Sequence, residues 1–152
     1  MNFLVQGNSE SGKSTAAEML AKMIGSPPPR NCSDFIIRDF ATTNGLDPQE
    51  VLAHKDEYRQ QLFMFGKSKQ DVDPAYPVSE AFKHTKVVTG IRRKENLDGA
   101  KHLIDKIIWI DRKTAKPNQT DQLGPEYADI IIDNNGSLKD LEINLIAAVQ
   151  GK

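Results

Sequence analysis

Short apolar runs are separated along this chain by longer amphipathic segments. The clearest run, residues 106–111, reads KIIWID and carries four consecutive large apolar side chains. A continuous run of this kind is typical of a strand whose two faces are both buried in a parallel sheet. We therefore expect strands at residues 2–6, 86–90, 106–111 and 129–132, with a weaker strand at 30–32.

Between these runs, apolar residues recur at the three- and four-residue spacing of helices. Gly25, followed by three prolines, ends the first helix, and Ser33 or Asp34 is expected to cap the second. Ser137 is expected to cap the last helix. The helices predicted in this way span residues 12–24, 33–43, 78–82, 95–103 and the segment from 137 onward.

The middle of the chain has weaker signals. Asp47-Pro48 resembles a helix start, and apolar residues continue at helical spacing as far as Phe63, which predicts one long helix. The stretch from Gly66 to Pro77 is polar and contains two prolines, so we expect an irregular connection there.

Strands that alternate with helices from end to end predict an α/β fold. The expected architecture is a doubly wound parallel sheet of about five strands with helices on both faces. A chain of 152 residues fits a single domain, residues 1–152. Ligands of such sheets bind at the carboxyl ends of the strands. The candidate site loops are therefore residues 7–14, 33–34, 90–93, 112–116 and 133–136.

The loop after the first predicted strand carries the most specific motif in the chain. It has the form G-x-x-x-x-G-K-S, preceded by a strand and followed by a helix, and this context defines a phosphate-binding P-loop. Lys13 would reach the β- and γ-phosphates of a nucleoside triphosphate, and the Ser14 hydroxyl would bind Mg²⁺. The residues predicted to bind the nucleotide, ATP, are Gly7, Asn8, Ser9, Glu10, Ser11, Gly12, Lys13, Ser14 and Thr15.

Composition narrows the class of protein only a little. Twenty basic residues nearly balance 21 acidic ones, so no overall field draws the chain to nucleic acid or to a membrane surface. Basic residues at 92–94 and 112–113 still allow a local basic cleft. The single cysteine, Cys32, excludes an internal disulfide and is expected in the core. No apolar stretch has the length of a membrane span, so we expect an intracellular protein.

Phosphoryl transfer depends on positioning and on neutralisation of charge. Arg92 and Arg93 precede a predicted helix, where cations oppose the helix dipole unless they face an anion. Together with Lys13, they are the expected catalytic cations. A solvated helix start is the alternative for the two arginines.

Lys55 and Arg59 are spaced four residues apart on the predicted long helix. Two cations at this spacing repel each other unless an anion lies between them, so an acceptor phosphate could be their ligand. A solvated helix face, with Asp56 as the partner of Arg59, is an equally good interpretation.

Asp34 follows the second predicted strand. It could hold the water shell of Mg²⁺, accept a proton from a hydroxyl acceptor, or simply favour the helix N-terminus. An acceptor phosphate is already ionised and needs no base, whereas a hydroxymethyl acceptor does. The role of Asp34 therefore distinguishes two classes of acceptor. His54, His84 and His102 lack metal-ligand spacing and are expected at the surface.

Three segments of the last third of the chain resemble a known family. Residues 87–96 read VVTGIRRKEN, residues 107–112 read IIWIDR, and residues 128–138 read ADIIIDNNGSL. Together with the P-loop, they resemble the deoxynucleoside monophosphate kinases of bacteriophages and the related phage enzymes that phosphorylate 5-hydroxymethyluracil in DNA. The resemblance covers about half of the chain. It implies a cytoplasmic enzyme (in the host cytoplasm if the chain comes from a phage) that uses ATP and Mg²⁺.

The same resemblance implies roles for particular positions. Residues 90–93 would contact the acceptor or the transferred phosphoryl group. From the residue chemistry above, Asp34, Lys55 and Arg59 are expected to bind the acceptor together with Arg92. A lid of about fifteen residues would carry Arg112, Lys113 and Lys116, and residues 134–136 would pack on the donor base. One position departs from the pattern of many P-loop enzymes, because Thr89 stands where an aspartate holds the Mg²⁺ water shell.

Three functions are consistent with these residues. The favoured one is a kinase that phosphorylates a deoxynucleoside monophosphate with ATP. The second keeps the chemistry but takes 5-hydroxymethyluracil within DNA as acceptor, since a chain this short leaves an open cleft. The third is a module that binds a nucleotide without transferring phosphate, and Thr89 motivates it.

Overall fold

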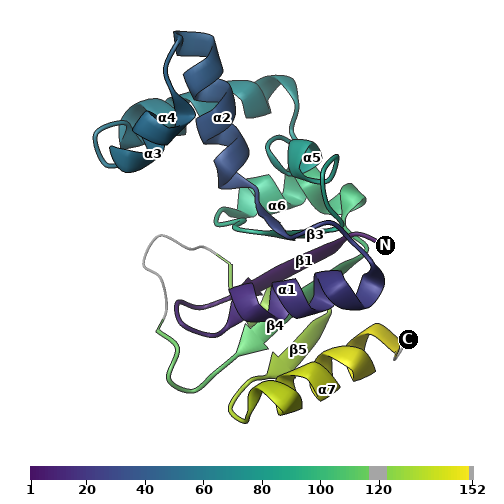
Figure 1. The fold of residues 1–152 in the computed structure, drawn as a ribbon. Coiled ribbons are helices and arrows are strands. Elements are labelled where there is room, and N and C mark those ends of the chain that lie inside the picture. The colour runs from purple at the N-terminus through teal and green to yellow at the C-terminus, as the bar shows by residue number, and fades with distance from the viewer. Residues whose placement is uncertain (117–122, 151–152) are drawn as a thin grey trace.

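The computed structural model describes residues 1–116 and 123–150. Within these residues the chain forms a five-stranded parallel sheet with the strand order β2-β3-β1-β4-β5 (Figure 1). The prediction of a doubly wound parallel α/β fold is confirmed. The strands are β1 (Phe3–Gly7), β2 (Arg30–Asn31), β3 (Val87–Thr89), β4 (Lys106–Asp111) and β5 (Ile130–Asp133).

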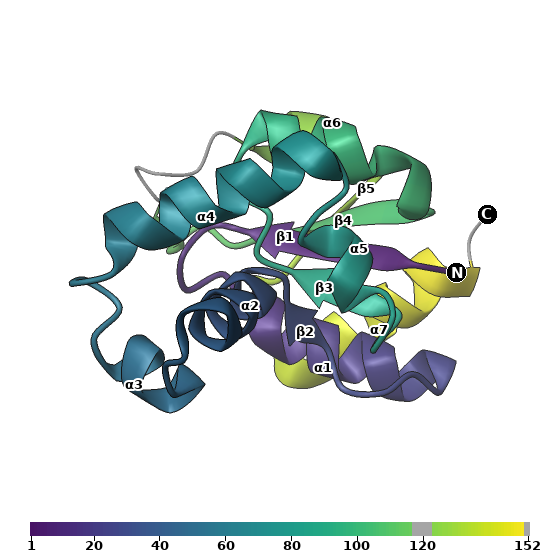
Figure 2. The ribbon, with the colours of Figure 1, turned by 90° about the horizontal axis from the view of Figure 1, so that it is seen from above.

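Helices cover both faces of the sheet. Helices α1 and α7 pack on one face, and α5 and α6 pack on the other (Figure 2). The helices are α1 (Lys13–Ile24), α2 (Ser33–Asn44), α3 (Pro48–Ala53), α4 (Arg59–Val72), α5 (Val78–Ala81), α6 (Lys94–Ala100) and α7 (Leu138–Gln150). Short 3₁₀ turns occupy Lys101–Leu103 and Pro125–Tyr127. No helix of the described residues is long and apolar enough to cross a membrane.

The strand β1 shows why its run is apolar throughout. Phe3 and Val5 point into the core below α1 and α7, whereas Leu4 points into the core below α5 and α6. Successive side chains of a strand alternate between faces, so a central strand covered on both sides needs apolar residues at every position. β1 lies between β3 and β4, with Leu4 paired to Val88 and Ile107. The loop that follows β1 therefore leaves the middle of the sheet.

Helices α2, α3 and α4 form a separate part of the molecule beyond the edge of the sheet (Figure 1). They enclose their own small apolar cluster, in which Phe40 contacts Tyr58 and Phe65 edge to face. Gly66 lets α4 approach α2, because a Cβ there would lie 3.2 Å from Ile36. This packing supplies the stability of α4, whose own sequence is polar.

The prediction for this region was wrong in two respects. The long helix expected from Asp47 to Phe63 is divided into α3 and α4, with turns at residues 54–58 closed by the Glu57 N–H and the His54 carbonyl. The irregular connection expected from Gly66 is helical as far as Val72. Residues 54–58, which separate the two helices, contain no glycine or proline that would predict the break. Contacts with α2 determine where each of the two helices lies.

Helix ends were predicted better. Gly25 ends α1 in the left-handed conformation. Ser137 and Asp140 cap α7 reciprocally: the Ser137 hydroxyl accepts from the Asp140 N–H at 3.2 Å, and the Asp140 carboxylate accepts from the Ser137 N–H at 3.1 Å. Trp109, on the strand β4, is buried.

Candidate functional site

The P-loop joins β1 to α1, and the side chain of Asn134 packs against it and fixes its shape. Gly12 adopts φ +89°, and a Cβ at this position would overlap the side-chain amide of Asn134. That amide is buried and donates a hydrogen bond to the Ser11 carbonyl at 2.8 Å. Only glycine meets both requirements at position 12, because the left-handed conformation and the close approach each exclude a side chain.

The loop fits a phosphate chain. The Lys13 ammonium crosses it and donates to the Gly7 carbonyl at 3.0 Å, so its charge lies over the concave side. The first N–H groups of α1 have no acceptor inside the helix and are available to an anion. A Cβ at Gly7 would lie 2.9 Å from the Ile110 carbonyl, so the first glycine is also required by the space available.

A hollow of about 590 Å³ reaches from Ser14 along α1, and its lining includes Asn31, Asp34 and Thr89 as well as Glu18 and Lys22 of α1. It brings together the two oxygen-bearing side chains that the sequence predicted near the metal, the Ser14 hydroxyl and the Asp34 carboxylate. No group of three or more His, Cys, Asp or Glu residues that could hold a metal occurs among the described residues. The donor set fits Mg²⁺, which binds through one or two protein ligands, water and substrate phosphates.

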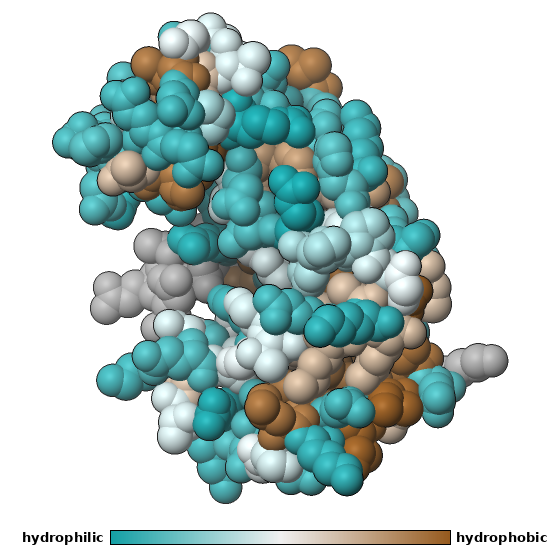
Figure 3. Space-filling model, viewed as in Figure 1, coloured by the Kyte–Doolittle hydropathy of each residue, from teal (hydrophilic) through white to brown (hydrophobic). Residues whose placement is uncertain are grey.

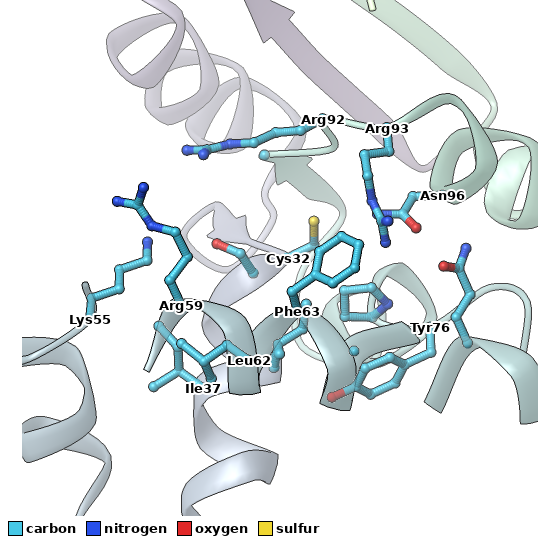
Figure 4. Close-up of a pocket in the computed structure, with 16 residues that line it drawn as sticks. Cys32, Ile37, Lys55, Arg59, Leu62, Phe63, Tyr76, Arg92, Arg93 and Asn96 are labelled. Carbon is cyan, nitrogen blue, oxygen red and sulfur yellow. The ribbon is translucent and has the colours of Figure 1, made fainter. Parts of the chain in front are cut away.

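A larger cavity of about 680 Å³ lies on the other side of the β2–α2 junction (Figure 4). Apolar side chains such as Ile37 and Leu62 line it together with basic side chains. The amide side chains of Gln70 and Asn96 also line it. The space-filling view is indented between the α2–α4 part and the part that holds α1 (Figure 3). The cavity is lined by Cys32, Ser33, Ile36, Ile37, Lys55, Arg59, Leu62, Phe63, Gly66, Gln70, Tyr76, Pro77, Gly90, Arg92, Arg93 and Asn96.

Three cations from separate elements meet at one end of this cavity. Lys55 lies in the turn before α4, Arg59 begins α4, and Arg92 follows β3. Their charged ends point toward one another in Figure 4. Arg59 also forms an exposed ion pair with Asp56 at 2.6 Å, the partner proposed in the alternative interpretation. Lys55 and Arg59 therefore lie in the cavity together, although they do not share a helix.

Arg93 points elsewhere. Its guanidinium forms an ion pair with Glu95 at 2.8 Å and lies 4.7 Å from the centre of the Phe63 ring. The two arginines, adjacent in sequence, thus reach different parts of the cavity. Phe63 was not a predicted site residue.

The junction between β3 and α2 is assembled from three polar contacts. The Gln6 side chain, buried at the end of β1, donates to the Ile91 carbonyl at 2.6 Å and fixes the segment before Arg92. The Asn31 side-chain oxygen accepts from the Ser33 N–H at 3.0 Å and from the Ser33 hydroxyl at 2.8 Å. The N-cap residue of α2 is Cys32, whose side chain makes no capping hydrogen bond, and the Asn31 side chain, one residue earlier, caps the Ser33 N–H instead. The prediction that Ser33 or Asp34 would cap this helix was wrong.

Gly90 is required at this junction. It adopts φ +89°, and a Cβ there would overlap the Asn31 side-chain oxygen. Gly90→Ala is expected to lower the free energy of unfolding by about 2–4 kcal/mol, the sum of left-handed strain and a lost helix cap. Urea denaturation measures the change.

Gly25 provides the matched control. It is also left-handed, at φ +69°, but a Cβ there would meet nothing within 4 Å. Gly25→Ala is expected to cost only the strain, about 1–2 kcal/mol. Equal losses for the two variants would show that Gly90 and Asn31 are not coupled.

The segment after β4 returns to the P-loop. The Ser9 N–H donates to the Lys116 carbonyl at 3.1 Å, and the Lys116 N–H donates to the Ser9 carbonyl at 3.2 Å. The Lys113 N–H donates to the Asn135 side chain at 2.8 Å. Residues 112–116 of the expected lid therefore lie against the loop, while residues 117–122 are outside the described part. Asn134 supports the loop from its buried side, and its expected place near the donor base stays a prediction.

Two further expectations concern reactive side chains. Cys32 is buried, and burial, together with the nearby Asp34 carboxylate, raises the pKa of its thiol to about 12. The thiol thus stays protonated at neutral pH and serves as an apolar wall of the cavity. His54, His84 and His102 are exposed, as expected, although the His84 ring stacks on Phe35.

The sheet order, with the P-loop after its middle strand, defines the P-loop fold of the nucleoside-monophosphate-kinase-like class. Solved structures of low sequence identity share it, including the following two. Shikimate kinase from Aquifex aeolicus vf5 matches with a TM-score of 0.52 and 16% identity over 100% of both chains. The TT1252 protein of Thermus thermophilus matches with a TM-score of 0.56 and 16% identity, over 98% of this chain and 96% of that one. No family model and no curated protein matches the sequence.

Proposed function

We propose that this protein is an ATP-dependent kinase that transfers the γ-phosphoryl group of ATP to the phosphate of a deoxynucleoside monophosphate. The observation that carries the proposal is the convergence of Lys55, Arg59 and Arg92 on one cavity between α2, α4 and the segment after β3. Like charges gathered in this way repel one another, and a bound dianion would offset the repulsion. The fold supports phosphoryl transfer, since one of the solved structures that share it is a shikimate kinase.

The donor side would be held by the P-loop. Its N–H groups and the Lys13 ammonium would bind the β- and γ-phosphates of ATP. Ser14 would bind Mg²⁺ directly, and Asp34, which lines the same hollow, would hold its water shell in place of the aspartate that Thr89 replaces. Mg²⁺, when bound, neutralises charge on the transferred group.

The acceptor side favours a phosphate over a hydroxyl group. A hydroxyl acceptor requires a base within hydrogen-bond reach. Asp34 lines the hollow around Ser14 and is not among the residues that line the acceptor cavity. No aspartate or glutamate lines that cavity, as far as the described residues show, while Arg92 and Arg59 do. The resemblance includes phage kinases of both acceptor classes, so the choice of a phosphate acceptor rests on the lining of the cavity.

An acceptor screen with γ-labelled ATP tests the proposal. The purified protein is incubated with each common deoxynucleoside monophosphate, with 5-hydroxymethyl-dUMP, and with DNA containing 5-hydroxymethyluracil. We expect a labelled diphosphate from at least one monophosphate. Label in the DNA alone would replace the proposal with the DNA kinase. ATP binding without a labelled product from any acceptor would leave a non-catalytic nucleotide-binding module.

A further inference from the structure

The cavity has two ends of different chemistry. The cations Lys55, Arg59 and Arg92 stand at one end, and Phe63, Arg93 and Asn96 stand at the other (Figure 4). The cations account for a phosphate. A ligand that filled the rest of the cavity would have to satisfy an aromatic ring, a guanidinium plane and an amide.

Phe63 is the unusual residue at this second end. Its side chain remains 52% exposed although it lines a cavity, while Leu62, the preceding residue, is buried in the α2–α4 cluster. Single exposed apolar residues are common and need no function. Phe63 differs from these because its ring faces a concave site and a cation covers it.

That cation is Arg93. Its guanidinium lies 4.7 Å from the ring centre and is fixed there by Glu95, whose carboxylate it contacts at 2.8 Å. The Arg93 side chain is only 23% exposed. A guanidinium and an aromatic ring held in this way form a surface onto which a planar, electron-rich heterocycle can stack.

We infer that Phe63 and Arg93 form a stacking platform for the nucleobase of the acceptor, with the Asn96 amide at its edge. The inference rests on the proposed function and specifies it further: the acceptor must carry a planar heteroaromatic ring as well as a phosphate. It also gives Arg93 a binding role in place of the catalytic role expected from the sequence, since its guanidinium is engaged by Glu95 and Phe63.

Binding measurements with two probes separate the platform from the phosphate end. Calorimetric titration compares the four common deoxynucleoside monophosphates with 2-deoxyribose 5-phosphate, which has the same sugar and phosphate but no base. For Phe63→Ala we expect the tightest deoxynucleotide to bind about 10- to 100-fold more weakly, because stacking of one base on an aromatic residue contributes on this scale. The affinity for 2-deoxyribose 5-phosphate should change less than about twofold.

Three further variants serve as controls. Phe63→Trp keeps an aromatic face and should retain the deoxynucleotide affinity, whereas Phe63→Leu keeps the apolar packing and should lose it. Met64→Ala changes the next residue of α4, which is 62% exposed and lies outside the cavity, and should bind like the wild type. Arg93→Lys keeps the charge but not the plane, so we expect a raised KM with a smaller change in kcat.

The possible failures can be told apart. If Phe63→Ala weakens both probes equally, or neither, the platform is disproved while deoxynucleotide phosphorylation by the wild type stands. If Arg93→Lys lowers kcat with KM unchanged, Arg93 acts on the transferred group and the platform loses its second member. If the wild type binds and phosphorylates no deoxynucleotide, the proposed function fails, and the platform fails with it.

Discussion

Replacement of Lys13 by alanine is expected to lower kcat by about 100- to 1000-fold, the usual cost of removing one group that stabilises transition-state charge. The ammonium already lies across the P-loop, 3.0 Å from the Gly7 carbonyl, so little reorganisation is needed when phosphate binds. Its charge would stabilise the oxygens between the β- and γ-phosphates as the bond to the leaving group breaks. Steady-state kinetics with saturating acceptor measure the loss, and calorimetry measures ATP affinity.

Lys67→Ala is the matched control. Lys67 is an exposed lysine of α4 that lines neither the cavity nor the hollow, so its removal changes the net charge by the same amount. Thermal unfolding of both variants should stay close to that of the wild type, because neither side chain fills the core. Unchanged ATP affinity and unchanged product formation in Lys13→Ala would disprove the account of the donor site.

The donor site could be predicted because its determinants are local. The spacing of Gly7, Gly12, Lys13 and Ser14 encodes the loop, and the flanking strand and helix follow from the apolar pattern. The buried contact between Asn134 and the Ser11 carbonyl could not be predicted, since 123 residues separate the two. Nothing in the local sequence of Asn134 indicates that its amide supports this loop.

The cavity lined by Lys55, Arg59 and Arg92 was harder to predict, because it depends on where α4 lies. Lys55 and Arg59 were expected on one helix face, and a helix face is a local property. In the structure, a turn separates Lys55 from α4, and the cavity exists only because α4 packs on α2 through Gly66 and Leu62. Packing between distant segments overrides propensity in this region.

For Arg92 and Arg93, too, the sequence did not predict where each side chain lies. The sequence indicates that both could face an anion, since both precede a helix. Arg93, however, has the extended conformation, φ −113° and ψ 143°, and adjacent side chains on extended backbone point in different directions. The Arg92 guanidinium thus points toward Lys55 and Arg59, and the Arg93 guanidinium lies over Phe63. The backbone at this turn is fixed by Gln6 and Gly90, and it determines which arginine faces which end of the cavity.

This geometry makes Arg92 the cation whose loss should most affect the acceptor. For Arg92→Ala we expect kcat/KM for the deoxynucleoside monophosphate to fall about 10- to 100-fold, because the loss of a hydrogen bond between charged groups costs roughly 1.5–3 kcal/mol. ATP affinity should be unchanged, since the P-loop forms a separate site. Lys83→Ala, which removes an exposed cation paired with Glu80 and outside the cavity, should leave both constants unchanged.

Ionic strength supplies a second measurement of the same site. In the wild type, salt should raise the KM for the acceptor, because three cations attract one phosphate. Arg92→Ala should show a shallower dependence, as one of these charges is absent. If Arg92→Ala loses activity but keeps the wild-type salt dependence, Arg92 stabilises the fold and does not bind the acceptor phosphate. Thermal unfolding would then show a matching loss of stability.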